Sequence, residues 1–248
     1  MEMHQLDKRL GRMLSEIQTL AIIKTVPVEG VEYAPRDSQD FVPFENGGEW
    51  AQQTEWVDFR FSVTVPEDFK GQPTLALRTG LEAEWEAVNP QFVAHVNGRI
   101  EQAFDTKHTT MVLPEGKPGA KYEIYLQGYA ARGDDKARPP RLFLMLADVD
   151  DPTVQLYYDL AMPWEAACLL PEGARDRERT LNILSQALNL LDLREPHSPA
   201  YDAGVAAARA FMDAYYKERE ALEPESYADC VGHTHIDVAW LWDLYQTR

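Results

Sequence analysis

The feature that most constrains the fold is a strict alternation of apolar and polar residues between positions 57 and 65. Every second position is apolar, in the order Val57, Phe59, Phe61, Val63 and Val65, and Asp, Arg, Ser and Thr lie between them. Because successive side chains of a β-strand point to opposite faces, this pattern predicts a strand with one buried face and one solvent face. Pro66 ends the strand.

Several shorter strands are predicted downstream of this one, separated by turns that contain proline and glycine. The dipeptide Asn97-Gly98 indicates a hairpin, because both residue types tolerate the positive φ angles of a type I′ turn. Many short strands with such turns are typical of an antiparallel β-sandwich, which we place at residues 26–165. The further strands are predicted at residues 74–79, 92–96, 109–113, 122–129 and 141–147.

Helical periodicity flanks the predicted sandwich on both sides. The N-terminal segment, residues 1–25, has apolar residues at steps of three and four, which predicts a surface helix packed on a later domain. Residues 166–222 contain two more such series, joined by Ser198 as an N-cap and Pro199 at the first helical position, so we expect a helical hairpin. The three series are Leu6, Leu10, Met13, Ile17, Leu20; Leu181, Leu184, Leu188, Leu191; and Val205, Ala208, Met212, Tyr215.

Composition limits the classes of function. The chain has 248 residues and 45% hydrophobic content, enough for two ordinary domains with real cores. Its formal net charge of −17 argues against a nucleic-acid partner and an anionic membrane surface. The sequence shows neither an apolar run near the roughly 18 residues of a membrane span nor a signal-peptide core, so we expect a cytoplasmic protein. Cys168 and Cys230 lie in apolar contexts, which predicts buried thiols without a disulfide framework.

The segment 223–248 contains the run Gly-His-Thr-His-Ile-Asp-Val-Ala-Trp-Leu-Trp, which starts at Gly232. In an extended strand His233, His235 and Asp237 would share one face. Imidazole nitrogen and carboxylate oxygen are suitable ligands for a borderline divalent ion such as Zn²⁺. The same alternation also occurs in histidine pairs that bind no metal, so the spacing alone leaves both interpretations open.

This run resembles the first barrel strand of the family 38 glycoside hydrolases, the zinc-dependent retaining α-mannosidases, whose bacterial members read much like Gly-His-x-His-Ile-Asp-x-Ala-Trp-Leu-Trp. The resemblance implies that His235 and Asp237 bind Zn²⁺ or another divalent metal and that Trp240 forms part of the sugar pocket. It implies that His233 supports the ligands without binding the metal itself. The aromatic-rich strand Trp56–Val65, the hairpin at Val96-Asn-Gly and the segment 104–108 also resemble the N-terminal domain of these enzymes, less specifically.

The resemblance further implies an α+β chain in which residues 223–248 begin an incomplete (β/α) barrel. A complete barrel needs about 250 residues, so we expect the nucleophile and the acid/base carboxylate downstream and no catalytic residue in this chain. The expected function is therefore that of the N-terminal part of a glycoside hydrolase acting on mannose-containing oligosaccharides, inactive alone. Self-association into a homo-oligomer is left open.

The alternative is a stand-alone carbohydrate-binding or scaffold β-sandwich protein without catalysis. Trp50, Trp56 and Trp85 are candidates for a flat platform under a sugar ring, although large aromatic residues of a sandwich more often belong to its core. Asp105 and His108 lie close together in the sequence, and we interpret them as a loop contact rather than a metal site.

Overall fold

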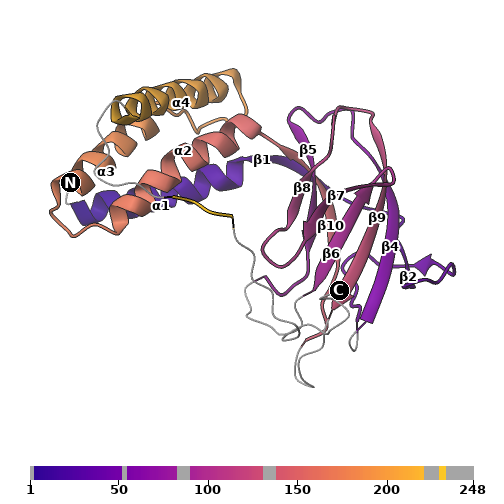
Figure 1. Cartoon of the computed structure of the whole chain (residues 1–248). Helices are drawn as coiled ribbons and strands as arrows, with labels where there is room; N and C mark the ends of the chain where they lie inside the picture. Colours follow the sequence, from indigo (N-terminus) through magenta and orange to yellow (C-terminus); the bar gives the residue numbers. More distant parts are fainter. Residues whose placement is uncertain (1–2, 52–54, 83–89, 131–137, 221–228, 233–248) are drawn as a thin grey trace. The chain divides into compact units, whose positions relative to one another are not determined.

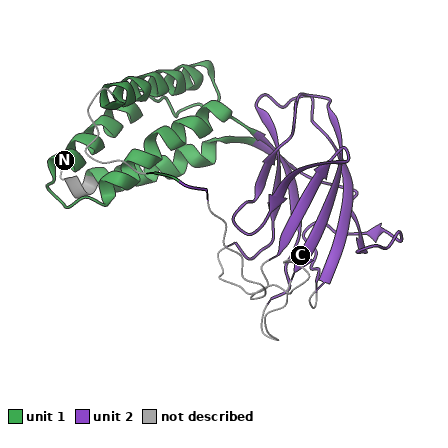
Figure 2. Ribbon diagram, viewed as in Figure 1, with its two compact units in different colours: residues 1–23, 149–230 green, residues 24–148, 231–248 purple. Residues whose placement is uncertain are grey.

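A computed structural model describes residues 3–51, 55–82, 90–130, 138–220 and 229–232. The chain divides into two compact units, one formed by residues 1–23 and 149–230 and the other by residues 24–148 and 231–248 (Figure 2). Residues 24–148 of the second unit are thus inserted into the chain of the first. The two ends of the insertion are adjacent, because the backbone N–H of Asp150 donates to the carbonyl oxygen of Ala21 at 2.8 Å.

The inserted unit is a sandwich of two antiparallel sheets (Figure 1), as the sequence predicts. Among the described residues, one sheet has six strands and the other has four. The six-stranded sheet has the order β3 (Val42–Pro43), β2 (Glu32–Pro35), β4 (Glu55–Thr64), β9 (Lys121–Ala130), β6 (Gln91–Val96) and β7 (Arg99–Phe104). The four-stranded sheet has the order β1 (Ile22–Pro27), β10 (Phe143–Val149), β5 (Gln72–Arg78) and β8 (Thr110–Val112).

The alternating segment forms the centre of the six-stranded sheet. Strand β4 pairs with β9 along its whole length, from Glu55 opposite Ala130 to Thr64 opposite Lys121. Its five predicted apolar positions are buried in the core of the sandwich, and Phe59 packs its ring against Trp50 and Phe92. The predicted hairpin is also confirmed, because Asn97 and Gly98 connect β6 to β7 with φ angles of 50° and 79°.

The other unit is helical and consists of α1 (Met3–Leu20), α2 (Asp151–Cys168), α3 (Arg175–Leu188) and α4 (Pro199–Glu220). The predicted helical hairpin corresponds to α3 and α4, and the Ser198 hydroxyl accepts a hydrogen bond from the N–H of Tyr201 at 3.3 Å, as an N-cap should. The apolar residues predicted on both helices lie in one helical core together with Leu10 and Ile17 of α1. The N-terminal helix therefore packs on α2 and α3.

The helix α2 begins within the stretch that the sequence analysis gives to the sandwich. It starts at Asp151, has Pro in its first turn, and continues through Pro163 to Cys168. Of the predicted barrel segment 223–248, the structure describes only residues 229–232, and no closed barrel occurs in the described part of the chain. None of the described helices is long and apolar enough to cross a membrane.

The prediction of two buried thiols is wrong. Cys168 at the end of α2 is only partly buried, and Cys230 is exposed. The apolar neighbours of Cys230 in the sequence do not cover it, since Val231 is itself 83% exposed. Both are free thiols.

Candidate functional site

The predicted metal site and sugar pocket lie outside the described residues. This holds for His233, His235, Asp237 and Trp240. The zinc site is therefore still a prediction. Within the part of the chain that the structure describes, no group of three or more His, Cys, Asp or Glu side chains is arranged to hold a metal ion.

The Asp105 carboxylate stabilises a tight loop, as the sequence analysis expects. Its Oδ1 accepts hydrogen bonds from the backbone N–H groups of Lys107 and His108, both at 2.7 Å. The His108 Nδ1 atom lies 2.9 Å from Oδ2. Partial burial alone would raise the pKa of Asp105, but the hydrogen bonds from His108 and Lys107 outweigh it and lower the pKa. The Asp105 carboxylate therefore closes a turn.

Trp50 and Trp56, the two described tryptophans among the candidates, do not form the platform considered from the sequence. Trp50 is 4% exposed and belongs to the sandwich core, where it contacts Phe59 and Phe92. Trp56 is half-buried, and the guanidinium of Arg36 lies over its ring at 4.2 Å from the ring centroid. Trp85 lies outside the described residues.

A polar network crosses the outer face of the six-stranded sheet. Asp58, in a position that the alternation predicts to be solvent-facing, is only 4% exposed. The Arg36 Nε atom donates to its Oδ1 at 3.3 Å. Burial, followed by the hydrogen bond to Asp58, raises the pKa of the neighbouring Tyr125 to about 12. Next to it, His95 Nε2 lies 3.3 Å from Gln127 Oε1. Sequence reasoning missed this network because its members come from three strands, β4, β6 and β9, and from the turn after β2, and the sequence does not reveal how these segments pair.

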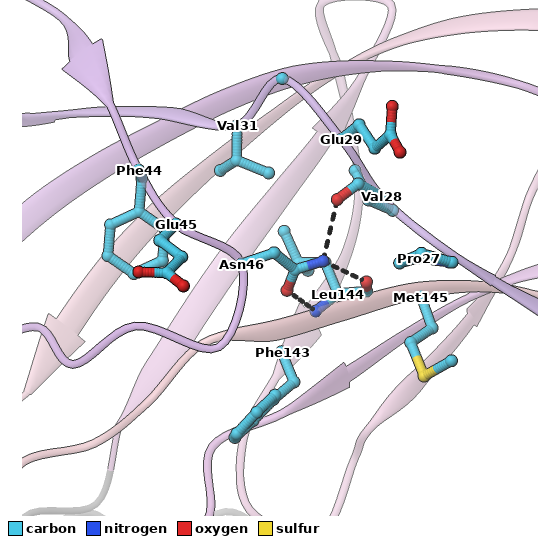
Figure 3. Close-up of a pocket in the computed structure, with 11 residues that line it drawn as sticks. Pro27, Val28, Glu29, Val31, Phe44, Glu45, Asn46, Phe143, Leu144 and Met145 are labelled. Atoms are coloured by element: carbon cyan, nitrogen blue, oxygen red, sulfur yellow. Dashed lines mark hydrogen bonds between the residues drawn. The ribbon is translucent and has the colours of Figure 1, made fainter.

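A surface pocket of about 500 Å³ lies where three segments of the sandwich meet (Figure 3). The segments are residues 27–31 between β1 and β2, residues 44–46 after β3, and residues 143–145 of β10. All three belong to the sandwich unit.

Asn46 fixes these three segments to one another with its side-chain amide. Its Nδ2 donates to the carbonyl oxygens of Val28 and Leu144, each at 2.8 Å, and its Oδ1 accepts from the N–H of Leu144 at 2.8 Å (Figure 3). Two backbone hydrogen bonds connect the same three segments. The N–H of Phe44 donates to the Val31 carbonyl oxygen, and the N–H of Val28 donates to the Leu144 carbonyl oxygen. The amide thus adds to the backbone hydrogen bond that the Leu144 carbonyl oxygen accepts from Val28.

The pocket lining combines apolar surface with carboxylates. Phe143 and Met145 point outward from alternate positions of β10 and are 36% and 37% exposed. Glu29 and Glu45 are exposed acidic residues of the lining, which contains no Lys, Arg or His. This surface disfavours anions and suits a neutral or cationic ligand.

Comparison with known proteins gives distant relatives of one kind. No family model matches the chain. An α-mannosidase of Saccharomyces cerevisiae is 26% identical over 221 residues, which is 82% of this chain and 19% of the yeast protein. Mouse α-mannosidase 2C1 is 22% identical over 255 residues, covering 96% of this chain and 23% of the mouse protein. An α-mannosidase G of Dictyostelium discoideum is 21% identical over 260 residues. The chain spans about a fifth of the length of these curated relatives.

Solved structures give a weaker likeness. A β-glucuronidase of Faecalibacterium prausnitzii matches 51% of this chain and 32% of its own with a TM-score of 0.34 and 11% identity. A β-glucuronidase of Ruminococcus gnavus matches with the same TM-score and 6% identity over 51% of this chain and 29% of its own. These values are too low to support an inference about the fold or the function.

Proposed function

We propose that this chain is the N-terminal part of a retaining, zinc-dependent α-mannosidase that hydrolyses α-mannosides in mannose-containing oligosaccharides. The observation that carries the proposal is the similarity of 82–96% of the chain to proteins named α-mannosidase. The eleven-residue run from Gly232 to Trp242 also supports it, through its resemblance to the family 38 motif.

In this proposal His235 and Asp237 supply two of the zinc ligands. Imidazole and carboxylate are suitable donors, and a catalytic site takes three protein ligands plus an open position, so at least one further ligand comes from elsewhere. A bound zinc would polarise sugar hydroxyls and stabilise charge in the transition state. His233 orients the ligands by hydrogen bonding, and Trp240 gives the sugar an apolar wall.

The carboxylates that carry out hydrolysis belong to the remainder of the longer protein. A retaining glycosidase needs a nucleophile and an acid/base whose carboxyl groups are about 5 Å apart. We assign neither role to a residue of this chain. The 248-residue chain alone is therefore expected to hydrolyse no mannoside.

The test compares the 248-residue chain with a longer form translated from the same gene beyond Arg248, each assayed with an aryl α-mannoside and added zinc. The proposal predicts turnover by the longer form only, with loss of turnover and of bound zinc in His235→Ala. Absence of an open reading frame beyond Arg248 would instead favour a stand-alone binding or scaffold protein. Turnover by the short chain that survives His235→Ala would contradict the site assignment.

Metal affinity separates the two possible ligand sets of the short chain. Because two ligands on an incomplete site bind zinc weakly, isothermal titration with zinc should show weak binding that His235→Ala abolishes and His233→Ala retains. Tight stoichiometric binding that both variants abolish would make His233 a ligand.

A further inference from the structure

The pocket in Figure 3 has the dimensions of a small-molecule site. Its volume of about 500 Å³ lies within the range of roughly 300–1,000 Å³ that is usual for such sites. Its lining comes from three separate segments of the sandwich, at residues 27–31, 44–46 and 143–145. A concave site built from several segments can contact one ligand from several sides.

The walls of the pocket are already fixed without a ligand. The Asn46 amide makes three hydrogen bonds of 2.8 Å to the two neighbouring segments. The Phe143 ring is held in place by close packing on Gly47, where an added Cβ would lie 2.8 Å from the ring. A ligand entering this pocket therefore loses little free energy to ordering of the protein.

The lining specifies the chemistry of the ligand. The exposed surface of Phe143 and Met145 favours a ligand with an apolar C–H face, since the negative face of an aromatic ring attracts positively polarised hydrogens. Glu29 and Glu45 can only accept hydrogen bonds when ionised, so the ligand must supply O–H or N–H donors. The lining contains no basic side chain, and the Arg141 guanidinium, 5.8 Å from the centroid of the Phe143 ring, is paired with Glu49. An anionic ligand would therefore meet the two carboxylates without a counter-charge in the lining.

A neutral sugar ring meets these three requirements together, because its C–H faces are apolar and its edges carry hydroxyl donors. We propose that this pocket is a carbohydrate-binding site of the sandwich that accepts a neutral hexose. The proposal concerns the lining at residues 27–31, 44–46 and 143–145 and does not depend on mannosidase activity. Phe143 packs on the sugar ring, and Glu29 and Glu45 accept hydrogen bonds from its hydroxyls.

The test titrates the full 248-residue chain with methyl α-mannoside and an α-mannobiose, followed by ligand-observed NMR and calorimetry. Binding is expected with a dissociation constant in the millimolar range, about −4 kcal/mol. Phe143→Ala and the double variant Glu29→Gln, Glu45→Gln should each weaken it at least tenfold. The double variant retains side-chain volume and therefore serves if Phe143→Ala fails to fold.

Two matched controls should bind the sugar like the parent chain. Val112→Ala removes an exposed apolar side chain from β8 of the same sheet, where Val112 is 49% exposed. His235→Ala alters the predicted metal motif and leaves the lining at residues 27–31, 44–46 and 143–145 unchanged. Binding that is lost in His235→Ala but unchanged in the pocket variants would overturn the proposal, since the sugar would then occupy the motif. Absence of sugar binding, or binding of tetramethylammonium instead, would also overturn it, because a compact cation suits an acidic aromatic pocket as well.

Discussion

Replacing Asn46 by alanine is expected to destabilise the sandwich by much more than an ordinary surface substitution. The change removes three hydrogen bonds and leaves the N–H of Leu144, a fully buried residue, without its acceptor. An unsatisfied buried group costs about 1–3 kcal/mol and each lost bond about 0.5–1.5 kcal/mol, and water entering the open pocket recovers part of this. We expect a net loss of about 2–3 kcal/mol in the free energy of unfolding.

The assay is hydrogen exchange of the backbone amides in residues 142–148, measured by mass spectrometry. Because the chain has two compact units, a global denaturation curve need not be two-state, whereas exchange reports on β10 itself. A loss of 2 kcal/mol corresponds to roughly thirtyfold faster exchange. The matched control is Gln102→Ala, which removes one exposed hydrogen bond to Thr110 O and should leave exchange in β10 unchanged.

The variant Asn46→Asp adds a pH dependence whose sign can be derived. A carboxylate can still accept from Leu144 N–H, but its second oxygen faces the carbonyl oxygens of Val28 and Leu144, so the folded state raises its pKa. A raised pKa gives stability that is present at low pH and lost as pH rises through the folded value. The difference in unfolding free energy between the variant and the parent should therefore shrink as pH falls through the raised folded-state pKa, and it should be smallest below about pH 4. Two results would refute this account of the pocket. One is a difference in unfolding free energy between Asn46→Asp and the parent that does not change with pH, and the other is a loss of less than about 0.5 kcal/mol in the unfolding free energy of Asn46→Ala.

Three further outcomes are expected. Gly204→Ala should destabilise α4 despite the better helix propensity of alanine, since its Cβ would lie 2.9 Å from the carbonyl oxygen of Leu190; thermal unfolding would measure a cost of about 1–3 kcal/mol. Burial and then the Asp7 carboxylate raise the pKa of Cys168. In a chain whose Cys230 is replaced by alanine, Asp7→Asn should therefore shift the pH profile of Cys168 alkylation to lower pH. Tyr125 should titrate near pH 12 by ultraviolet absorbance, and the stability that depends on its protonated form should disappear between about pH 10 and 12. Asp58→Asn should lower the pH at which Tyr125 is half ionised.

Sequence periodicity predicted the strands and helices that bury one face and expose the other. The alternation from Val57 to Val65 and the leucines of α3 are buried where the pattern requires. The same reasoning failed for Asp58, which lies on the solvent side of β4 but is covered by neighbours from other strands. Such burial depends on cross-strand partners, and period-two patterns carry no information about them.

The helix α2 shows a second limit of sequence reasoning. Proline inside a helix removes one backbone hydrogen bond and usually ends the helix, and the predicted boundary between sandwich and helices, at residue 165, lies two residues after Pro163. The structure tolerates Pro163 because α2 packs on α1, α3 and α4, with Leu156 and Leu160 fully buried. The pocket was equally hidden, since its three segments are separated by long stretches of sequence. For the metal motif at 233–242, the resemblance is still the basis of the prediction.

The insertion of the sandwich into the helical unit has a consequence for how the protein is made. During synthesis α1 leaves the ribosome first, but the helices that cover Leu10 and Ile17 follow only after every strand of the sandwich has been translated. The sandwich can fold in the interval, because domains generally fold as units while the chain is growing. Its two ends meet at Ala21 and Asp150, so a folded sandwich returns the nascent chain close to the waiting α1. Once the sandwich has folded, α1 and the later helices are close together although they are far apart in the sequence. The contacts of the helical core then form with a smaller entropic cost of loop closure.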